Sequence, residues 1–332
     1  MSFDGLFIQS NESDGNRLFA FPRAEDGRLG EPTVVATGGQ GDGVPHLTSQ
    51  GSVVLTSDGE YVLVANAGSG NVTVLSAKRA PEVLAVVPTG GSAPKSVTEH
   101  NGLVYVLNTG DGSLAAFRLS GGDVDHRTLL AGSDPAQVGF TPDGSAVIVT
   151  DRAANALFVY PVDGDGRLGE PQSTPSAGPT PYGFAFAAGE TLVVTEAFGA
   201  AKGKAAASSY RLDGHSAASV TESVGNGRSE ICWAVASPDG RYVFTTNFAD
   251  GAVSRYAVTE KGELILEDAV AASAVDGEPG LRDEGLSANG RFLYAVDADG
   301  GRVFGWGVSD GALTPLGSWN GLPATVAGIA VT

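Results

Sequence analysis

Residues 237–247 read Ser-Pro-Asp-Gly-Arg-Tyr-Val-Phe-Thr-Thr-Asn, and this stretch decides the fold. Its Pro-Asp-Gly portion favours a tight turn, because Pro presets φ near −65° and Gly adopts positive φ without steric cost. The run at 242–246 is β-branched and aromatic, which is typical of a strand. The segment therefore predicts a turn that leads directly into a β-strand.

The same unit recurs seven times along the chain, and only the details of the turn vary. The turns lie at 4–5, 58–59, 101–102, 143–144, 188–189, 239–240 and 289–290. The strands that follow them lie at 6–9, 61–65, 103–107, 146–150, 191–195, 242–246 and 292–296. The turns are separated by about 42 to 54 residues, which matches the period of a four-stranded propeller blade.

Two further features favour a closed ring. The run Tyr-Val-Leu-Val-Ala at 61–65 is apolar on both faces, as expected for a strand that lies between two neighbouring blades. Residues 325–332 read as an innermost strand without a partner, and 5–9 read as a second strand without a first. We therefore predict an all-β, seven-bladed propeller of four-stranded antiparallel blades. One domain spans 1–332, and the two terminal strands close the ring within one blade.

Composition excludes several classes of function. The 48 glycines and 17 prolines fit many short strands joined by tight turns. The formal charge of −18 disfavours binding to nucleic acid and to anionic membrane surfaces. No apolar run reaches the roughly 20 residues of a membrane span, and the N-terminal residues lack the features of a signal peptide. A single cysteine permits no internal disulfide. We expect a cytoplasmic protein whose partner is a small molecule; the oligomeric state is open.

Topology sorts the polar residues between two faces. If the strands of each blade are called A to D from the channel outward, the Asp-Gly turns are A–B turns and lie on the bottom face. The B–C turns and D–A loops then share the top face. One polar residue per blade begins each B–C turn: Asn11, Asn66, Asn108, Asp151, Glu196, Asn247 and Asp297. Asn and Asp suit a hairpin turn. Glu196 is a poor turn former and is therefore a candidate binding residue.

The D–A loops supply the other candidates for a site on the top face. These are His46, Gln50, Lys95, Gln137, Tyr182, Glu230, Trp233, Arg282, Asp283 and Glu284. Glu284 falls where other blades have Val138 or Ala234, and an acid on an inner strand is costly unless it is paired or functional. Arg282 precedes Glu284 by two residues, so a regular strand places both side chains on one side. We expect the two to pair or to share a ligand.

The segments 237–247, 141–144 and 290–296 resemble the lactonase-type propellers, a family that includes 6-phosphogluconolactonase and the carboxymuconate-lactonizing enzymes. The resemblance covers essentially the whole chain and implies a site of His, Glu and Arg on D–A loops. Arg282 matches the family's Arg. Glu230 and Ile231 resemble its Glu-Ile pair but lie three residues farther from the turn. The family's His and Arg-His positions hold Ala136-Gln137 and Tyr182 here, and His46, from another blade, is the possible substitute.

Two functional hypotheses follow. The first is an enzyme that hydrolyses or cyclises a small lactone or carboxylic acid by general acid/base chemistry. Its catalytic residues would be Glu284, Glu230 and His46, with substrate bound by Arg282, Asp283, Tyr182, Trp233, Gln137, Lys95, Gln50 and Glu196. The second is a propeller that binds a ligand or a protein without catalysis. The histidines lack metal-ligand spacing and no nucleotide-binding loop is present, so no cofactor is expected. A divalent-cation site at the ring of B–C residues is an open alternative.

Overall fold

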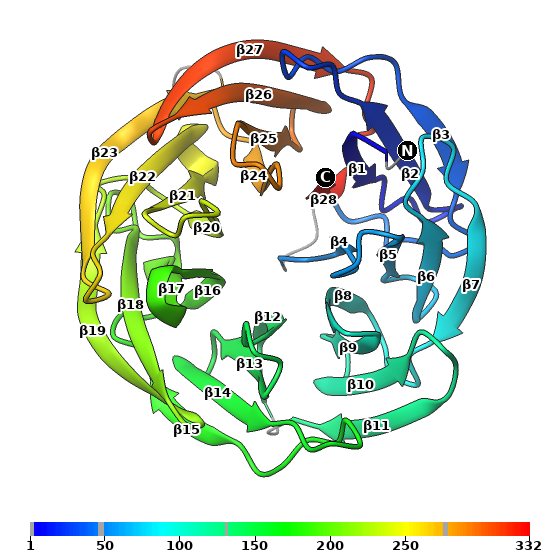
Figure 1. Ribbon diagram of the computed structural model, residues 1–332, viewed down its shortest axis with the longest axis horizontal. Coiled ribbons are helices and arrows are strands. Elements are labelled where there is room, and N and C mark those ends of the chain that lie inside the picture. Colours follow the sequence, from blue (N-terminus) through cyan, green and yellow to red (C-terminus); the bar gives the residue numbers. More distant parts are fainter. Residues whose placement is uncertain (1–2, 46–49, 130–131, 275–277) are drawn as a thin grey trace.

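The computed structural model describes residues 3–45, 50–129, 132–274 and 278–332. These residues form seven four-stranded antiparallel sheets arranged in a ring, with the first strand of each sheet around the centre and the last at the rim (Figure 1). The predicted seven-bladed propeller is confirmed. None of the helices among the described residues is long and apolar enough to cross a membrane.

The blades are numbered here in chain order. Blade 1 contains β28 (Ala327–Val331), β1 (Gly5–Gln9), β2 (Arg17–Pro22) and β3 (Thr33–Ala36). Blade 2 contains β4 (Val53–Leu55), β5 (Tyr61–Asn66), β6 (Asn71–Ser76) and β7 (Val83–Pro88). Blade 3 contains β8 (Pro94–His100), β9 (Leu103–Asn108), β10 (Ser113–Arg118) and β11 (Asp123–Thr128). Blade 4 contains β12 (Pro135–Phe140), β13 (Ala146–Asp151), β14 (Ala156–Pro161) and β15 (Gln172–Pro175).

The remaining blades follow the same order from the channel to the rim. Blade 5 contains β16 (Pro181–Ala187), β17 (Thr191–Glu196), β18 (Ala206–Asp213) and β19 (Ser216–Gly225). Blade 6 contains β20 (Ile231–Ala236), β21 (Tyr242–Asn247), β22 (Ala252–Val258) and β23 (Leu264–Ser273). Blade 7 contains β24 (Leu281–Leu286), β25 (Phe292–Asp297), β26 (Arg302–Ser309) and β27 (Ala312–Asn320). Short 3₁₀ turns occupy Ala188–Glu190, Phe198–Ala200 and Phe248–Asp250.

The ring closes through the two ends of the chain, as the sequence predicts. Strand β28 pairs antiparallel with β1, and Phe7 lies opposite Ala330 (Figure 1). Hydrogen bonds continue past the strand, because Gly5 N–H donates to Thr332 Oγ1 at 2.8 Å and Thr332 N–H donates to the Gly5 carbonyl at 3.0 Å. The innermost strand of blade 1 therefore comes from the opposite end of the chain to its three partners.

The hydrophobic core is divided into layers between neighbouring blades. Between blades 7 and 1, Leu6 and Ile8 pack with Tyr294 and Val296. On the opposite side of blade 1, Phe7 belongs to a separate buried cluster shared with blade 2. Successive residues of β1 thus serve different layers because strand side chains alternate. This explains why the middle strands are apolar on both faces.

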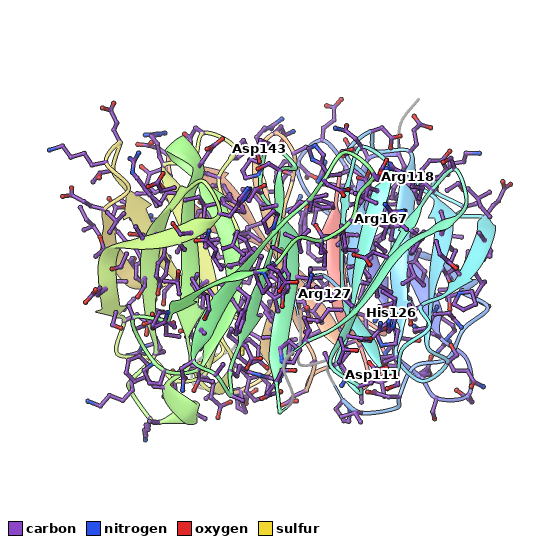
Figure 2. All side chains as sticks on the ribbon, turned by 90° about the horizontal axis from the view of Figure 1, so that it is seen from below. Asp111, Arg118, His126, Arg127, Asp143 and Arg167 are labelled. Atoms are coloured by element: carbon purple, nitrogen blue, oxygen red, sulfur yellow. The ribbon has the colours of Figure 1, made fainter. Side chains whose placement is uncertain are left out.

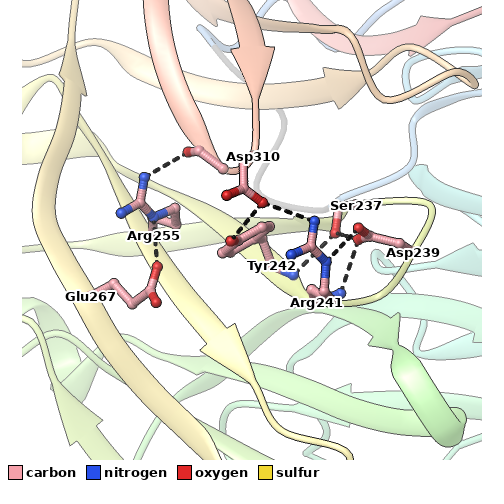
Figure 3. Close-up of polar contacts among 8 residues, drawn as sticks. Ser237, Asp239, Arg241, Tyr242, Arg255, Glu267 and Asp310 are labelled. Atoms are coloured by element: carbon pink, nitrogen blue, oxygen red, sulfur yellow. Dashed lines mark hydrogen bonds and ion pairs between the residues drawn. The ribbon is translucent and has the colours of Figure 1, made fainter.

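The bottom face is built from the repeated A–B turns. In blade 6, Asp239 accepts hydrogen bonds from Ser237 Oγ at 2.6 Å and from Arg241 Nε at 2.7 Å (Figure 3). The Ser237 hydroxyl is the main cause that lowers the pKa of Asp239 to about 2. Arg241 also binds Asp310 at 2.9 Å, which ties the turn to blade 7 (Figure 3). The turn residues are therefore engaged in structure.

The two faces of the disc are separated by the height of the strands. Asp143 lies in the A–B turn of blade 4 and Asp111 in the B–C turn of blade 3, and they lie near opposite faces of the disc (Figure 2). The face that carries the B–C turns and D–A loops is called the top face here. It is the face on which the sequence predicts the functional site.

The inner strands share an irregularity close to the top face. The pairing register shifts between Pro94 and Ser96 in β8 and between Pro135 and Gln137 in β12. Strands β16, β20 and β24 show the same shift, which in β24 falls between Leu281 and Glu284. A bulge interrupts the alternation of side chains and re-aims them. Consequently, the i, i+2 alternation of a regular strand does not predict where the side chains point at the positions of the site residues.

Candidate functional site

A cavity of about 470 Å³ opens on the top face and spans four consecutive blades, 4 to 7. Its lining combines loops with the first residues of inner strands. The described residues around it are Asp134, Arg152, Ala153, Thr180, Tyr182, Ala197, Gly199, Ala200, Glu230, Cys232 and Arg282. We call it the top-face pocket. It brings together three predicted site residues, namely Glu230, Arg282 and Tyr182.

Arg282 is the most unusual residue of the top-face pocket. Its side chain is only 7% exposed, and its guanidinium carbon lies 4.1 Å from the centre of the Phe248 ring. Within the described part of the chain it makes no ion pair, and its Nε has no hydrogen-bond partner. A buried, permanently charged guanidinium without a counter-ion is costly. The pocket therefore favours an anionic ligand at Arg282.

Glu230 lies in the same pocket, half-buried, at the residue that precedes β20. Its backbone is left-handed, with φ of 55°, which is unfavourable for a residue with a side chain. The Glu230 carbonyl accepts a hydrogen bond from Phe248 N–H at 2.9 Å, which holds this conformation. Thr180 and Ala200, also in the lining, have φ of 61° and 63°. A strained backbone conformation persists only where the surrounding structure enforces it, and such positions are often found at functional sites.

Arg152 is a site residue that the sequence analysis missed. Its guanidinium binds Asp134 at 2.6 Å and lies 4.9 Å from the centre of the Tyr182 ring, with its side chain 16% exposed. The carboxylate and the aromatic ring together orient the cation at the edge of the pocket. A signal was present in the sequence, because Arg152 is the only cation directly after a polar residue that begins a B–C turn.

The floor of the top-face pocket is aromatic. The rings of Tyr182 and Trp233 lie 5.0 Å apart between centroids, and Trp233 is completely buried beneath. Trp233 therefore supports the pocket and does not line it. Burial raises the pKa of the Cys232 thiol to about 12, so the thiol is neutral near pH 7. A neutral thiol is a weak nucleophile, which fits a packing role for Cys232.

The expected pairing of Arg282 with Glu284 is wrong. Arg282 faces the top-face pocket, whereas Asp283 and Glu284 line a second cavity of about 440 Å³ in the central channel. In the described residues no ion pair joins Arg282 to Glu284. The bulge between Leu281 and Glu284 is the physical reason, because it removes the i, i+2 alternation on which the expectation rested.

Both channel carboxyl groups are buried, with Asp283 4% and Glu284 6% exposed. Burial raises the pKa of Asp283 to about 6, against the opposing effects of Gly328 N–H and Arg282. Burial also raises the pKa of Glu284 well above its ordinary value, against the opposing effect of Thr246 N–H, and the nearby Asp283 adds to the rise. These two groups hold protons at a higher pH than ordinary carboxyl groups do.

Gln50 and Gln137 lie in the channel wall, where both amides are used structurally. Gln50 Nε2 donates to the Ala234 carbonyl at 2.9 Å, and Ala234 N–H donates back to Gln50 Oε1 at 3.1 Å. Gln137 forms the same two-bond contact with Phe184, at 3.2 and 2.7 Å. Each amide thus imitates a peptide group across inner strands. Their predicted role as substrate-binding residues has no support in these contacts.

The remaining predicted residues lie elsewhere. Glu196 is fully buried inside blade 5, where its oxygens accept hydrogen bonds from Gly178 N–H, Ser208 Oγ and Ser223 Oγ. Its role is structural, and the prediction that Glu196 belongs to the site is therefore wrong. Lys95 pairs with Asp42 at 3.3 Å and lines neither cavity. His46 lies outside the described residues.

The other B–C residues are structural as well. Asn66 donates to Asn71 Oδ1 and to Thr73 Oγ1, both at 2.8 Å, and Asn247 donates to Ser254 Oγ at 2.9 Å. Their side chains are buried and bonded to the next strand. Across the described chain, no group of three or more His, Cys, Asp or Glu side chains is placed to hold a metal ion. The ring of B–C residues therefore offers no cluster for the divalent cation considered from the sequence.

Comparison with known proteins agrees with this architecture. The family model described as lactonase, seven-bladed β-propeller matches residues 97–197 and 196–326, which is more than half of the chain. A search of the curated proteins found none with significant sequence similarity to this chain.

Several solved structures share the fold. A periplasmic gluconolactonase from Pseudomonas aeruginosa is 18% identical over 96% of both chains, with a TM-score of 0.76. A candidate 6-phosphogluconolactonase from Bacteroides fragilis is 16% identical over 98% of this chain and 97% of that one, with a TM-score of 0.75. A protein of unknown function from Desulfotomaculum acetoxidans is 15% identical over 98% of both chains, also with a TM-score of 0.75. At such low identity these structures show a common fold and leave the reaction open.

Proposed function

Because the chain belongs to the family of seven-bladed lactonase propellers, we propose that it hydrolyses a small lactone that carries an anionic group. The observation that supports this proposal is that Arg282, buried and without an ion pair among the described residues, lines the same pocket as Glu230. One group is suited to bind negative charge and the other to accept a proton. The reaction needs both functions.

The chemistry assigns one role to each residue. Glu230 accepts a proton from a water molecule as the water oxygen attacks the lactone carbonyl carbon. Negative charge then develops on the carbonyl oxygen, and Arg282 stabilises that oxyanion in a site with little exposure to solvent. The ring C–O bond breaks, and protonated Glu230 returns its proton to the departing ring oxygen. The product is an open-chain hydroxy acid.

Arg152 supplies the second contact for the substrate. Its charge is partly neutralised by Asp134, and its position over Tyr182 is held from two sides. A planar guanidinium oriented in this way suits a carboxylate or phosphate group. Arg152 would thus bind the non-reacting anionic end of the lactone while Arg282 faces the reacting carbonyl. The Cys232 thiol takes no part, since its pKa is raised to about 12.

The test is a panel of lactones assayed at pH 7.5, with and without carboxylate or phosphate substituents. Arg282→Ala should lower kcat/KM by roughly 100- to 1,000-fold through loss of oxyanion stabilisation. Glu230→Gln should lower kcat by roughly 100- to 10,000-fold through loss of the base. Arg152→Ala should mainly raise KM, and only for the anionic lactones.

Arg291→Ala is the matched control. Arg291 also lies over a phenylalanine ring, 5.1 Å from the centre of Phe292, but it belongs to the bottom face and lines no part of the pocket. Its removal should leave kcat/KM unchanged. Full activity of the Arg282→Ala protein, verified as folded by circular dichroism, would refute the proposed role of the top-face pocket.

A second candidate function is ligand binding without catalysis. It is favoured by the fully buried Ala136 and by Tyr182, which stand where the resemblance to the family implies His and Arg-His. This candidate predicts that product-like hydroxy acids bind in a manner that depends on Arg282 while every lactone of the panel remains intact. Turnover of any panel lactone that depends on Glu230 excludes it.

A further inference from the structure

The central channel contains a cavity that the proposed reaction does not use. Described residues of all seven inner strands line it, and its volume is about 440 Å³. A water molecule occupies roughly 30 Å³ in the liquid, so the cavity has room for an ion together with several waters. It is lined by other residues than the top-face pocket.

Asp283 and Glu284 both contribute to the wall of this channel cavity, although they are consecutive residues. In a regular strand, consecutive side chains point to opposite faces. The bulge at the start of β24 breaks that rule and allows both carboxyl groups to border one cavity. The sheet irregularity thus brings two acids together at one place in the channel.

Neither carboxyl group is fully satisfied by the protein, although the backbone of Gly328 acts on Asp283 and that of Thr246 acts on Glu284. Both side chains are more than nine-tenths buried, and Asp283 Oδ2 and both Glu284 oxygens lack hydrogen-bond partners in the described chain. No Lys, Arg or His is among the described residues that line the cavity. Isolated buried carboxylates of this kind cost several kcal/mol unless a cation or a proton neutralises them.

Glu99 provides an internal comparison, because it also borders the channel cavity. Its Oε1 accepts a hydrogen bond from Gly102 N–H at 2.5 Å, and its Oε2 accepts one from Ser57 N–H at 2.6 Å. Glu99 is therefore satisfied by the A–B turns of blades 2 and 3. Among the described side chains that line the cavity, those with an unsatisfied buried oxygen are the adjacent pair on β24.

We propose that the central channel binds a hydrated divalent cation of the Ca²⁺ type through the carboxylates of Asp283 and Glu284. Ca²⁺ accepts six to eight oxygen ligands in flexible geometry and tolerates several waters among them. Mg²⁺ demands a regular octahedron and gives up its waters reluctantly, so an irregular pair of carboxylates suits it less. The inference is independent of the proposed lactonase activity.

The experiment uses the full chain, treated with EDTA and then dialysed, at pH 7.5. Isothermal titration with CaCl₂ should reveal one site above the weak background of a protein of charge −18. At 10 mM CaCl₂ the Tm should rise by about 2–6 °C relative to NaCl of equal ionic strength, as for a Kd of about 0.1–1 mM. MgCl₂ should give a smaller rise.

The variants separate this site from its surroundings. Glu284→Gln and Asp283→Asn should each remove the Ca²⁺-specific rise, whereas Glu99→Gln should keep it because Glu99 is bonded to the backbone of two A–B turns. Arg282→Ala should also keep a Ca²⁺-specific rise, because Arg282 lines the other cavity and its positive charge near Asp283 can only oppose binding of a cation. An equal Ca²⁺ response in the Asp283→Asn/Glu284→Gln double variant, or no response in the wild type, would overturn the proposal. A larger rise with MgCl₂ than with CaCl₂ would overturn the choice of ion.

Discussion

Glu196 and Glu284 are both buried glutamates on propeller strands, yet their surroundings are opposite. Glu196, at the end of a second strand, accepts hydrogen bonds from one backbone N–H and two serine hydroxyls. Glu284, on an inner strand, has two oxygens without a partner in the described chain. The Glu196 carboxylate stabilises blade 5 through these hydrogen bonds. The side-chain oxygens of Glu284 make no such bond among the described residues.

The difference identifies where this fold can carry function. Positions between strands of one blade are surrounded by donors from that blade, so an acid there is structural. Inner-strand positions border the channel or the top-face pocket, where the neighbouring blades leave space. Arg282, on inner strand β24, belongs to this second group, and Glu230, directly before inner strand β20, lines the same pocket. Unsatisfied charge, more than residue type, separates the candidate site from the scaffold.

The largest expected effect comes from removing the strand that closes the ring. Deleting 327–332 removes β28, which pairs with β1 and contributes Ile329 and Ala330 to the channel wall. The exposed edge of β1 should make the protein aggregate and abolish cooperative unfolding. Differential scanning calorimetry and light scattering measure this. Deleting Thr332 alone is the control, and a normal transition for the longer deletion would show that the closing strand is dispensable.

Glu196→Ala should give the next largest effect. The change leaves Gly178 N–H and the hydroxyls of Ser208 and Ser223 without their acceptor inside the blade, at about 1–3 kcal/mol each. The free energy of unfolding should therefore fall by about 4 kcal/mol or more, as measured by urea denaturation. Glu222→Ala, an exposed position on β19, should change it by less than about 0.5 kcal/mol. Equal effects of the two substitutions would contradict the comparison.

Glu284→Gln should change stability in the opposite direction. Burial raises the pKa of Glu284 well above its ordinary value, so keeping this carboxyl group ionised at pH 8 opposes folding. A neutral amide of the same shape avoids that cost, and the free energy of unfolding should therefore rise in EDTA at pH 8. The comparison at about pH 3, where the carboxyl group is protonated in both states, should show a much smaller change. A loss of stability at pH 8 would mean that an unseen partner holds the ionised carboxylate.

Asp283 should contribute a smaller, pH-dependent effect. Its pKa is raised from 3.8 to about 6 in the folded protein, mainly by burial. The stabilising protonated form is fully present below pH 3.8, and its contribution is lost as the pH rises towards 6. The loss amounts to about 1–3 kcal/mol. The difference in unfolding free energy between wild type and Asp283→Asn, followed from pH 4 to 7, should show this window, and a difference independent of pH would exclude it.

Much of the fold could be predicted from the sequence because its determinants are local. The Ser-Pro-Asp-Gly turn at 237–240 contains its own hydrogen bonds, with Asp239 bonded to Ser237 and Arg241. Apolar strands at a regular period then require neighbours on both faces, which leads to a closed ring. The membership of Arg282 and Glu230 in one pocket also followed from this topology, since both precede or begin inner strands on the same face.

What the sequence by itself determined is therefore the propeller, its closure and the face that carries the candidate site. Only the tertiary structure decided which side chains meet. The bulge in β24 separated Arg282 from Glu284, and the fold of blade 5 surrounded Glu196 with donors that lie up to 27 residues away in sequence. Arg152 enters the pocket through contacts with Asp134, in the loop before β12, and with Tyr182, in β16. The repeat could be predicted because its turns are stabilised by hydrogen bonds between residues close in sequence. The site could not, because its side chains come from separate blades that only the folded chain brings together.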